Sequence, residues 1–320
     1  MALPLKPPVK PQLALSRKQL PEGEEWAYEP KWDGFRAIVF VDGDDVYVQS
    51  RNGKPLSRYF PELTMPSGRY VADGELVILG KDGHEQFDAL QQRIHPAESR
   101  VRMLAEETPV RFQVFDLLAA NRKKLLGEPF AKRRDALEAL VESWRGVRGS
   151  VELTELVGAP KKADKWLRSG EGVIAKDCEA PYRPGERKGM VKVKRVRTID
   201  CVVVGWRPGK AEGTVGSLIL GLYDDSGELH VVGHTSSFKA KEKRELRAKL
   251  APYETGERGS GDPSRWDAGR ELEWHTVRPE LVVEITFDHT SAGRIRHGAK
   301  LLRWREDRDP KSCLFSQLES

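Results

Sequence analysis

The segment from residue 190 to residue 206 constrains the fold more than any other part of the chain. Residues 190–197 alternate Val with Lys or Arg, and residues 198–206 are almost continuously apolar. A period of two is typical of a half-buried strand, whereas a continuous apolar run is typical of a strand that is buried on both faces. Because the pattern changes near residues 195–199, we predict a first domain at residues 1–197 and a second at 198–320.

Elsewhere, strand patterns and a few helical patterns are separated by turn signals. The first domain shows no regular alternation of strand and helix, which favours an α+β fold of antiparallel sheets with flanking helices. In the second domain, short strands around a single helix fit a small five-stranded β-barrel of the OB type. Strands are predicted over 26–40, 46–49, 70–79, 110–118, 217–223, 229–234 and 281–287, and helices over about 97–106, 132–144, 160–168 and 239–250.

Composition excludes several classes of protein. Of the 320 residues, 38% are hydrophobic and 32% are charged, so the chain is globular rather than disordered. No apolar run approaches the roughly 20 residues of a membrane span, and the proline-rich start does not resemble a secretion signal. Three widely spaced cysteines lack the spacing of a structural zinc site and indicate a reducing cytoplasm. We therefore expect a cytoplasmic protein without membrane contact.

Positive charge is concentrated just before the predicted boundary. Residues 183–197 contain seven Lys and Arg residues and a single acid, Glu186, while the whole chain carries a net charge of +5. Such a cluster suits a phosphate-bearing partner. A solvated strand edge protected by lysines would give the same pattern, and charge alone does not separate these two interpretations.

The segment from Glu29 to Arg36 reads Glu-Pro-Lys-Trp-Asp-Gly-Phe-Arg. It places the Lys31 amine, a carboxylate, a sharp turn and a guanidinium within a few residues. A lysine is a covalent nucleophile only when it is deprotonated, which neighbouring cations, a metal ion or desolvation can promote. The alternative is a strand that ends in a hairpin turn with a solvated lysine.

Further motifs follow in order along the chain. Each one alone has a structural alternative, such as a loop arginine, a core phenylalanine or a pair of solvated lysines. Lys192 and Lys194 lie two residues apart, so both point to the same face of a strand, where a polyphosphate would relieve their repulsion. The other motifs are Ser50-Arg51-Asn52-Gly53, Asp73-Gly74-Glu75, Phe115-Asp116-Leu117-Leu118 and Glu171-Gly172-Val173-Ile174-Ala175-Lys176.

This colinear series resembles the motifs of covalent nucleotidyltransferases, the group that contains ATP-dependent DNA ligases and mRNA capping enzymes. The details are most similar to a compact bacterial ATP-dependent DNA ligase, related to the ligase domain of end-joining ligases. The resemblance covers residues 10–320, including the OB segment at 216–221 and the closing Arg305-Glu306-Asp307-Arg308. It implies a nucleotidyltransferase domain followed by an OB-fold domain.

The resemblance implies roles for the residues around the lysine. Lys31 would attack the α-phosphate of ATP and form lysyl-AMP with loss of pyrophosphate. Glu29 would receive the adenine amino group, and Phe115 would stack on the adenine. Arg36 and Arg51 would contact the nucleotide and the 5′-phosphate of the DNA.

The later motifs supply the metal and phosphate contacts that the resemblance implies. Glu75 would reach the ribose and support metal binding, and Glu171 would help to bind the divalent metal. Lys192 and Lys194 would cradle phosphates, Lys194 also on the DNA side, and Arg187 would face a phosphate.

The second domain would act on the leaving group of the first step. Arg305, with Asp307, matches the motif that orients the departing pyrophosphate. The sequence departs from the family at Met190, where Trp is common, and at Arg308, where Lys is usual; neither change removes a charge that the chemistry needs. Since only thirty residues precede Lys31, we expect the two catalytic domains themselves to grip the DNA.

The resemblance therefore implies an ATP-dependent DNA ligase that seals nicks in duplex DNA, with a role in DNA repair. The implied cofactors are ATP and Mg²⁺ or Mn²⁺, and the implied partner is nicked double-stranded DNA, with other repair proteins as further candidates. We expect a monomer in the cytoplasm, associated with the nucleoid. The alternatives are an RNA ligase, a capping-type guanylyltransferase, and a non-catalytic OB protein that binds nucleic acid.

Overall fold

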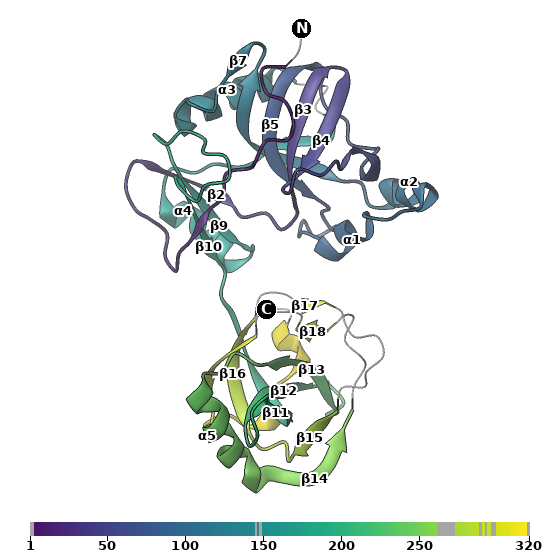
Figure 1. Ribbon diagram of the computed structural model, residues 1–320, viewed down its shortest axis with the longest axis vertical. Coiled ribbons are helices and arrows are strands. Elements are labelled where there is room, and N and C mark those ends of the chain that lie inside the picture. The colour runs from purple at the N-terminus through teal and green to yellow at the C-terminus, as the bar shows by residue number, and fades with distance from the viewer. Residues whose placement is uncertain are drawn as a thin grey trace. The chain divides into compact units, whose positions relative to one another are not determined.

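Figure 1 shows the computed structural model of the chain, which describes residues 3–318 except 145, 147–148, 261–272, 288–289, 292 and 296–298. The chain forms two compact units, Met1–Arg195 and Val196–Ser320. None of the described helices is long and apolar enough to cross a membrane.

The larger sheet of the first unit is mainly antiparallel and holds most of its core. Its strands follow the order β4-β3-β5-β6-β7, and β8 pairs parallel with β6. The strand β6 is buried along almost its whole length. The members are β3 (Phe35–Gly43), β4 (Asp45–Ser50), β5 (Gly68–Val77), β6 (Arg111–Ala120), β7 (Lys123–Lys124) and β8 (Val151–Leu153).

A smaller sheet of four strands completes the first unit. Its order is β1-β10-β9-β2, so the N-terminal segment of the chain pairs with a strand that lies almost 180 residues further on. In this sheet β9 lies between β2, which ends just before Lys31, and β10, which carries Lys192 and Lys194. The members are β1 (Leu15–Ser16), β2 (Trp26–Pro30), β9 (Gly172–Asp177) and β10 (Met190–Lys194).

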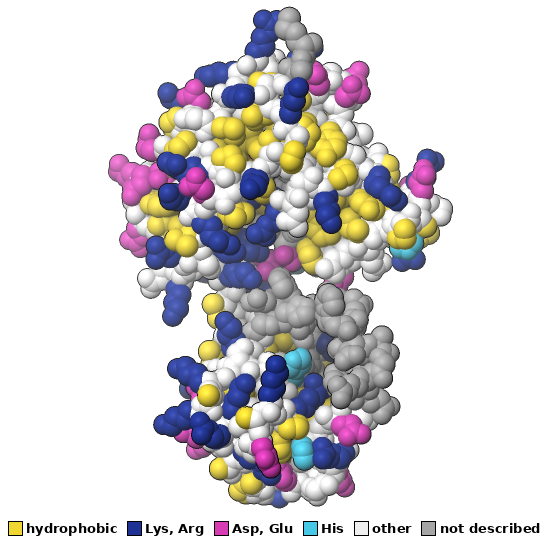
Figure 2. Space-filling model, viewed as in Figure 1, with side chains coloured by type: hydrophobic (Ala, Val, Ile, Leu, Met, Phe, Trp, Pro, Cys, Tyr) yellow, Lys and Arg dark blue, Asp and Glu magenta, His cyan; other side chains and the backbone are white. Residues whose placement is uncertain are grey.

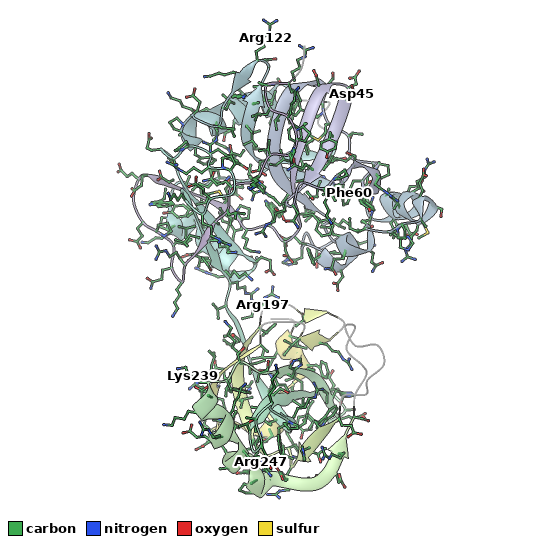
Figure 3. The ribbon with its side chains drawn as sticks, in the orientation of Figure 1. Asp45, Phe60, Arg122, Arg197, Lys239 and Arg247 are labelled. Carbon is green, nitrogen blue, oxygen red and sulfur yellow. The ribbon has the colours of Figure 1, made fainter. Side chains whose placement is uncertain are left out.

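Helices pack on the sheets of the first unit. The helix α3 buries Phe130, Leu137 and Val141 beside β6, while α4 begins with Pro160 in its first turn, where a missing N–H costs nothing. Figure 3 labels Asp45 at the start of β4 and Phe60 in the connection that follows it. The helices are η1 (Ser57–Tyr59), α1 (Phe87–Gln92), α2 (Glu98–Glu107), α3 (Phe130–Glu142) and α4 (Pro160–Arg168).

The second unit is an OB-type barrel built around the long strand β11 (Arg197–Pro208). This strand pairs with β12 along one edge and with β15 and β16 along the other, and its apolar residues form the centre of a separate core. The other elements are β12 (Val215–Tyr223), β13 (Leu229–Thr235), α5 (Ala240–Leu250), η2 (Ala251–Tyr253), β14 (Glu254–Gly259), β15 (Trp274–Val277), β16 (Val282–Phe287), β17 (Thr290–Ser291), β18 (Arg294–Ile295), β19 (Lys300–Trp304), η3 (Pro310–Ser312) and η4 (Phe315–Leu318).

The predicted helices and the other predicted strands are confirmed, but the strand predicted over 26–40 is two strands, β2 and β3, which belong to different sheets because the turn after Lys31 separates them. The structure also adds elements that the sequence patterns did not predict. The barrel sheet has seven strands among the described residues, where we predicted five. The strand β14, with the sequence Glu-Thr-Gly-Glu-Arg-Gly, shows why: it is largely exposed and has no apolar alternation that a pattern could reveal. The other unpredicted elements include β1, α1, β8 and β19.

Candidate functional site

A cavity of about 250 Å³ in the first unit collects most of the predicted site residues. Both sheets contribute to its wall, since β2, β9 and β10 belong to the small sheet while β3, β5 and β6 belong to the large one. The predicted residues that line it are Glu29, Lys31, Arg36, Arg51, Glu75, Phe115, Arg187 and Lys192.

Lys31 follows the last residue of β2 and is fixed by the turn that comes after it. Its backbone N–H donates to the carbonyl of Gly172 at 3.0 Å, and the Trp32 indole N–H donates to Thr154 Oγ1 at 3.2 Å. Gly34 is required in this turn because a Cβ atom there would lie 2.2 Å from the Leu76 carbonyl oxygen. The turn therefore holds the lysine at the cavity through backbone packing.

Arg36 is held by Asp73. The guanidinium donates from Nε and Nη2 to the two carboxylate oxygens at 2.6 and 2.7 Å, and the Tyr182 hydroxyl donates to the same carboxylate at 2.6 Å. The Asp73-Gly74-Glu75 motif therefore has a cationic neighbour, because β3 and β5 pair side by side. The Arg36 guanidinium also lies over the Phe115 ring, 4.5 Å from its centre.

Glu75 differs from Asp73 in its environment. Burial raises the pKa of Glu75 to about 7, although Arg36 and Lys31 act in the opposite direction. A partly buried carboxylate beside other acids is well suited to bind a divalent cation, which prefers oxygen ligands and would offset the cost of burying the negative charge. The residues present at this side of the cavity therefore fit a hard metal ion.

Glu29 is buried and bound to Lys176, whose role the sequence did not predict. The Lys176 amine lies 2.8 Å from one Glu29 oxygen and 2.9 Å from the other, and it also lies 4.4 Å from the centre of the Phe115 ring. Burial raises the pKa of Glu29 and lowers the pKa of Lys176, while their mutual attraction opposes both shifts. A carboxylate, an ammonium and an aromatic ring thus meet at one end of the cavity.

The cavity also gathers a cluster of cations around Lys192. Partial burial and the nearby charges of Lys194, Lys31, Arg51 and Arg187 together lower the pKa of Lys192. No ion pair is described for Arg51 or Arg187 in the part of the chain that the structure covers. Several cations gathered around one cavity form a binding site for phosphate groups.

Three predicted residues do not line this cavity. Lys194 lies at the end of β10, close enough to Lys192 to affect its pKa, and Glu171 lies just before β9. Arg305 belongs to the second unit, where Asp200 accepts from its Nη1 at 3.1 Å and Asp307 accepts from its Nε and Nη2 at 2.9 Å. Asp200 was not predicted as a partner.

Part of the cavity wall comes from the N-terminal segment, residues 11–14. The Leu13 N–H donates to the Glu186 carbonyl at 2.9 Å, and the Gly185 N–H donates to the Pro11 carbonyl at 3.1 Å. The sequence did not predict that this proline-rich segment lines a site. Both of its partners, Gly185 and Glu186, belong to the basic stretch that precedes β10.

Comparison with known proteins identifies the family. Residues 11–194 match the family model of the ATP dependent DNA ligase domain, and residues 211–308 match that of the ATP dependent DNA ligase C terminal region. The chain belongs to the ATP-dependent DNA ligase family. This ligase is therefore an enzyme that uses ATP and a divalent metal and acts on DNA.

Named relatives cover the ligase from end to end. It is 46% identical to DNA ligase C1 of Mycolicibacterium smegmatis, over 100% of this chain and 96% of that protein, and 44% identical to DNA ligase C of Mycobacterium tuberculosis. It is 31% identical to the multifunctional non-homologous end joining protein LigD of M. smegmatis, over 91% of this chain and 37% of LigD.

Solved structures agree with this assignment. A mycobacterial DNA ligase D complexed with ATP and MES is 29% identical, with a TM-score of 0.53, and the match covers 96% of this chain and 98% of that one. A structure of Lig E DNA ligases, 21% identical with a TM-score of 0.57, shares the fold.

Proposed function

We propose that this ligase seals nicks in duplex DNA through an AMP group carried on Lys31. The observation that carries the proposal is that Lys31 lines one cavity together with the cations Arg51, Arg187 and Lys192 and with the Glu29 carboxylate and the Phe115 ring. ATP needs both kinds of group, since it carries a triphosphate and an aromatic base. Family membership supports this reading.

The proposed reaction has three displacements. The lone pair of Lys31 Nζ attacks the α-phosphorus of ATP, so that an N–P bond forms, the bond to the β-phosphate oxygen breaks, and pyrophosphate and a proton leave. A 5′-phosphate oxygen of the nick then attacks the AMP phosphorus, the N–P bond breaks, and Lys31 regains a proton. Finally, the 3′-hydroxyl attacks the activated 5′-phosphate and loses its proton, a phosphodiester forms, the bond to the AMP phosphate oxygen breaks, and AMP leaves.

The chain's own residues contribute positioning and positive charge. Each displacement spreads negative charge over phosphate oxygens, and cations that are already in place stabilise it without reorganising. We assign this role to Lys192, Lys194, Arg51 and Arg187. Arg36, which Asp73 holds rigidly, would contact the nucleotide and the 5′-phosphate.

Glu75 and Glu171 would hold the divalent metal, Mg²⁺ or Mn²⁺. The metal would supply additional positive charge at the reacting phosphate. Glu75 would also reach the ribose. Its raised pKa fits a carboxylate whose ionised form a bound cation would stabilise near neutral pH.

The base would lie at the end of the cavity formed by Glu29, Lys176 and Phe115. Glu29 would accept a hydrogen bond from the adenine amino group, and the Phe115 ring would stack on the base. Both Glu29 oxygens already bind Lys176, so recognition of the base would use the remaining lone pairs of a carboxylate that is fixed in place.

We further propose that residues 1–197 form the adenylation domain and residues 198–320 the OB-fold domain. Arg305 would orient the departing pyrophosphate in the first step. A role in DNA repair in the cytoplasm, on nicked duplexes and alongside other repair proteins, is supported by the relatives whose names refer to end joining.

The decisive experiment is transfer of label from ATP to the protein. The purified ligase is incubated with α-labelled ATP and Mg²⁺ or Mn²⁺, and then with nicked duplex DNA. Wild type and the control Lys161→Ala, which replaces an exposed lysine of α4, should both be labelled at residue 31 and should seal the nick.

Lys31→Ala should take up no label, and chelation of the metal should abolish labelling of the wild type. Labelling from GTP instead of ATP would indicate a guanylyltransferase. Sealing of RNA but not DNA would indicate an RNA ligase. Sealing of nicks by Lys31→Ala at the wild-type rate would disprove the proposed intermediate.

A further inference from the structure

A second hollow, of about 870 Å³, lies along β1, the outermost strand of the small sheet in the first unit. It shares Arg187 and Met190 with the nucleotide cavity, so the two spaces are neighbours. Two segments that are far apart in the sequence enclose it, residues 15–21 with Trp26 and residues 187–191. We call this space the β1 hollow.

Hydrogen bonds fix the frame of the β1 hollow. The strand β1 pairs in parallel with β10, and the N–H of Arg17, which follows β1, donates to the Lys192 carbonyl at 3.0 Å. At the far end of the same wall, the hydroxyl of the buried Tyr28 donates to the Pro21 carbonyl at 2.7 Å. Both ends of this wall are therefore tied to the small sheet, and the hollow is formed by the fold itself.

The described lining of the β1 hollow is cationic and contains no acid. Its cations are Arg17, Lys18, Arg187 and Lys188. Lys188 lies 3.6 Å from Glu186, with both side chains exposed, whereas no ion pair is described for Arg17 or Lys18 within the ranges that the structure covers. The acids of the following loop, Glu22, Glu24 and Glu25, do not line the hollow. Cations gathered at a concave surface favour a ligand with several negative charges.

The β1 hollow also has an apolar side. Trp26 and Leu20 pack on the core of the small sheet and leave part of their surface to the hollow, and Leu15 is 37% exposed beside them. Figure 2 shows hydrophobic side chains next to Lys and Arg over this part of the first unit, where Figure 1 labels β2, β9 and β10. A ligand that fills the hollow must therefore offer apolar surface as well as negative charge.

Unpaired nucleic acid meets both requirements. In a single strand, the bases are free to stack on an aromatic ring while the phosphates bind cations. A duplex would satisfy the cations with its backbone, but its bases are paired inside, so Trp26 and Leu20 would stay uncovered. The proposed substrate also brings DNA to the neighbouring cavity, which shares Arg187 with this hollow.

We infer that the β1 hollow binds unpaired DNA beside the break, with a base against Trp26 and phosphates against Arg17 and Lys18. The inference rests on the proposed function for the source of this DNA. It adds a site for single strands to a reaction that requires only a nicked duplex, and it uses residues outside the motif series. The ligase should therefore hold a break that carries an unpaired flap more tightly than the same break without one.

The test measures binding of a single strand separately from the ligase reaction. The affinity of the full chain for a labelled oligothymidylate is measured with a chelator and without ATP. Arg17→Ala/Lys18→Ala and Trp26→Leu should each bind about tenfold more weakly than wild type, which corresponds to about 1.4 kcal/mol. On a nicked duplex, an added flap of unpaired thymidines should increase the affinity of the wild type but not that of these two variants.

Salt dependence separates the two kinds of contact. Each phosphate contact with a single strand contributes about 0.7 to the slope of the logarithm of the binding constant against the logarithm of salt concentration. Arg17→Ala/Lys18→Ala should therefore reduce the magnitude of this slope by about 1.4. Trp26→Leu should leave the slope unchanged, because it removes stacking and no charge.

Matched controls isolate the site. Lys161→Ala/Lys162→Ala removes two adjacent exposed lysines of α4, and Trp166→Leu changes a tryptophan that packs on the same core as Trp26 but does not line the β1 hollow. Both controls should bind oligothymidylate like the wild type. Lysyl-AMP formation without DNA should stay within twofold of wild type in all four variants, and urea unfolding reports whether each of them is folded.

Three results would overturn the inference. If both site variants bind oligothymidylate within twofold of the controls, Arg17 and Lys18 only protect the edge of the sheet. If an abasic strand binds as tightly as oligothymidylate, the hollow holds no base. Displacement of the oligonucleotide by polyglutamate of equal charge would assign the hollow to acidic protein segments. Absence of labelling in the wild type would instead contradict the proposed function and would leave these binding comparisons interpretable.

Discussion

The Tyr182 hydroxyl donates a 2.6 Å hydrogen bond to the Asp73 carboxylate, across 109 residues of sequence. The same hydroxyl accepts from the backbone N–H of Gln12 at 3.0 Å, while Asp73 holds Arg36 at 2.6 and 2.7 Å. One buried phenol thus connects the N-terminal wall of the nucleotide cavity to the guanidinium proposed to contact the nucleotide. We regard Tyr182 as a positioning residue, because Asp73 and Gln12 separate it from the cavity.

We expect Tyr182→Phe to slow lysyl-AMP formation about tenfold or more, because a small displacement of Arg36 weakens its contact with the reacting phosphate. The matched control is Tyr70→Phe, which also removes a buried hydroxyl that donates at 2.6 Å, in this case to the Pro66 carbonyl. Each change should cost about 1 kcal/mol in the free energy of unfolding. Equal rates of lysyl-AMP formation in the two variants would show that the Tyr182 hydroxyl is only structural.

The buried pair of Glu29 and Lys176 should be strongly coupled. Loss of either partner leaves the other charge buried without its main counter-ion, so Glu29→Leu and Lys176→Met should each lower the free energy of unfolding by about 3–5 kcal/mol. The double variant should recover much of this loss. Denaturant unfolding of wild type, the two single variants and the double variant measures the coupling, and additive losses of unfolding free energy would contradict it.

The pKa of Glu75 predicts how its contribution to stability depends on pH. Since burial raises this pKa from 4.5 to about 7, the folded chain keeps the proton between these values while the unfolded chain loses it. The contribution of Glu75 to stability therefore decreases as pH rises from 4.5 to 7 and stays constant above 7.

In the presence of a chelator, we expect Glu75→Gln to be more stable than wild type at pH 8, by at most about 3 kcal/mol, and equally stable at pH 4.5. The comparison uses urea unfolding at the two pH values. Glu106→Gln, in an exposed part of α2, is the control and should show no such pH dependence. A constant difference between wild type and Glu75→Gln across this range would contradict the prediction.

In the second unit, Arg305 and Arg303 offer a comparison between neighbouring arginines. Arg303 forms a 2.6 Å ion pair with Glu284, while Arg305 is bound to Asp200 and Asp307. If Arg305 orients pyrophosphate, Arg305→Ala should slow lysyl-AMP formation by about a hundredfold, whereas Arg303→Ala should not. Sealing of a nick that already carries AMP should be affected much less by either change. Labelling of Arg305→Ala at the wild-type rate would remove this residue from the first step.

The sequence alone predicted the strands, the main helices and the α+β class, because these depend on local periodicity. It also predicted that Lys31, Phe115 and Lys192 belong together, since they occur in an ordered series of motifs that resembles a known family. Short or polar elements such as β1 and β14 were not predicted. Their pairing depends on partners elsewhere in the chain and leaves no pattern in their own residues.

Only the tertiary structure decided which charges neutralise one another. Asp73 and Arg36 lie 37 residues apart, and Glu29 and Lys176 lie 147 residues apart, so neither pair is visible as a local pattern. Strand pairing brings the members of each pair together, and burial makes their contact necessary, because a lone charge in the core is unstable. The motifs therefore specified the chemical groups of the site, whereas the register of the sheets determined which groups are held rigidly and which remain available to a substrate.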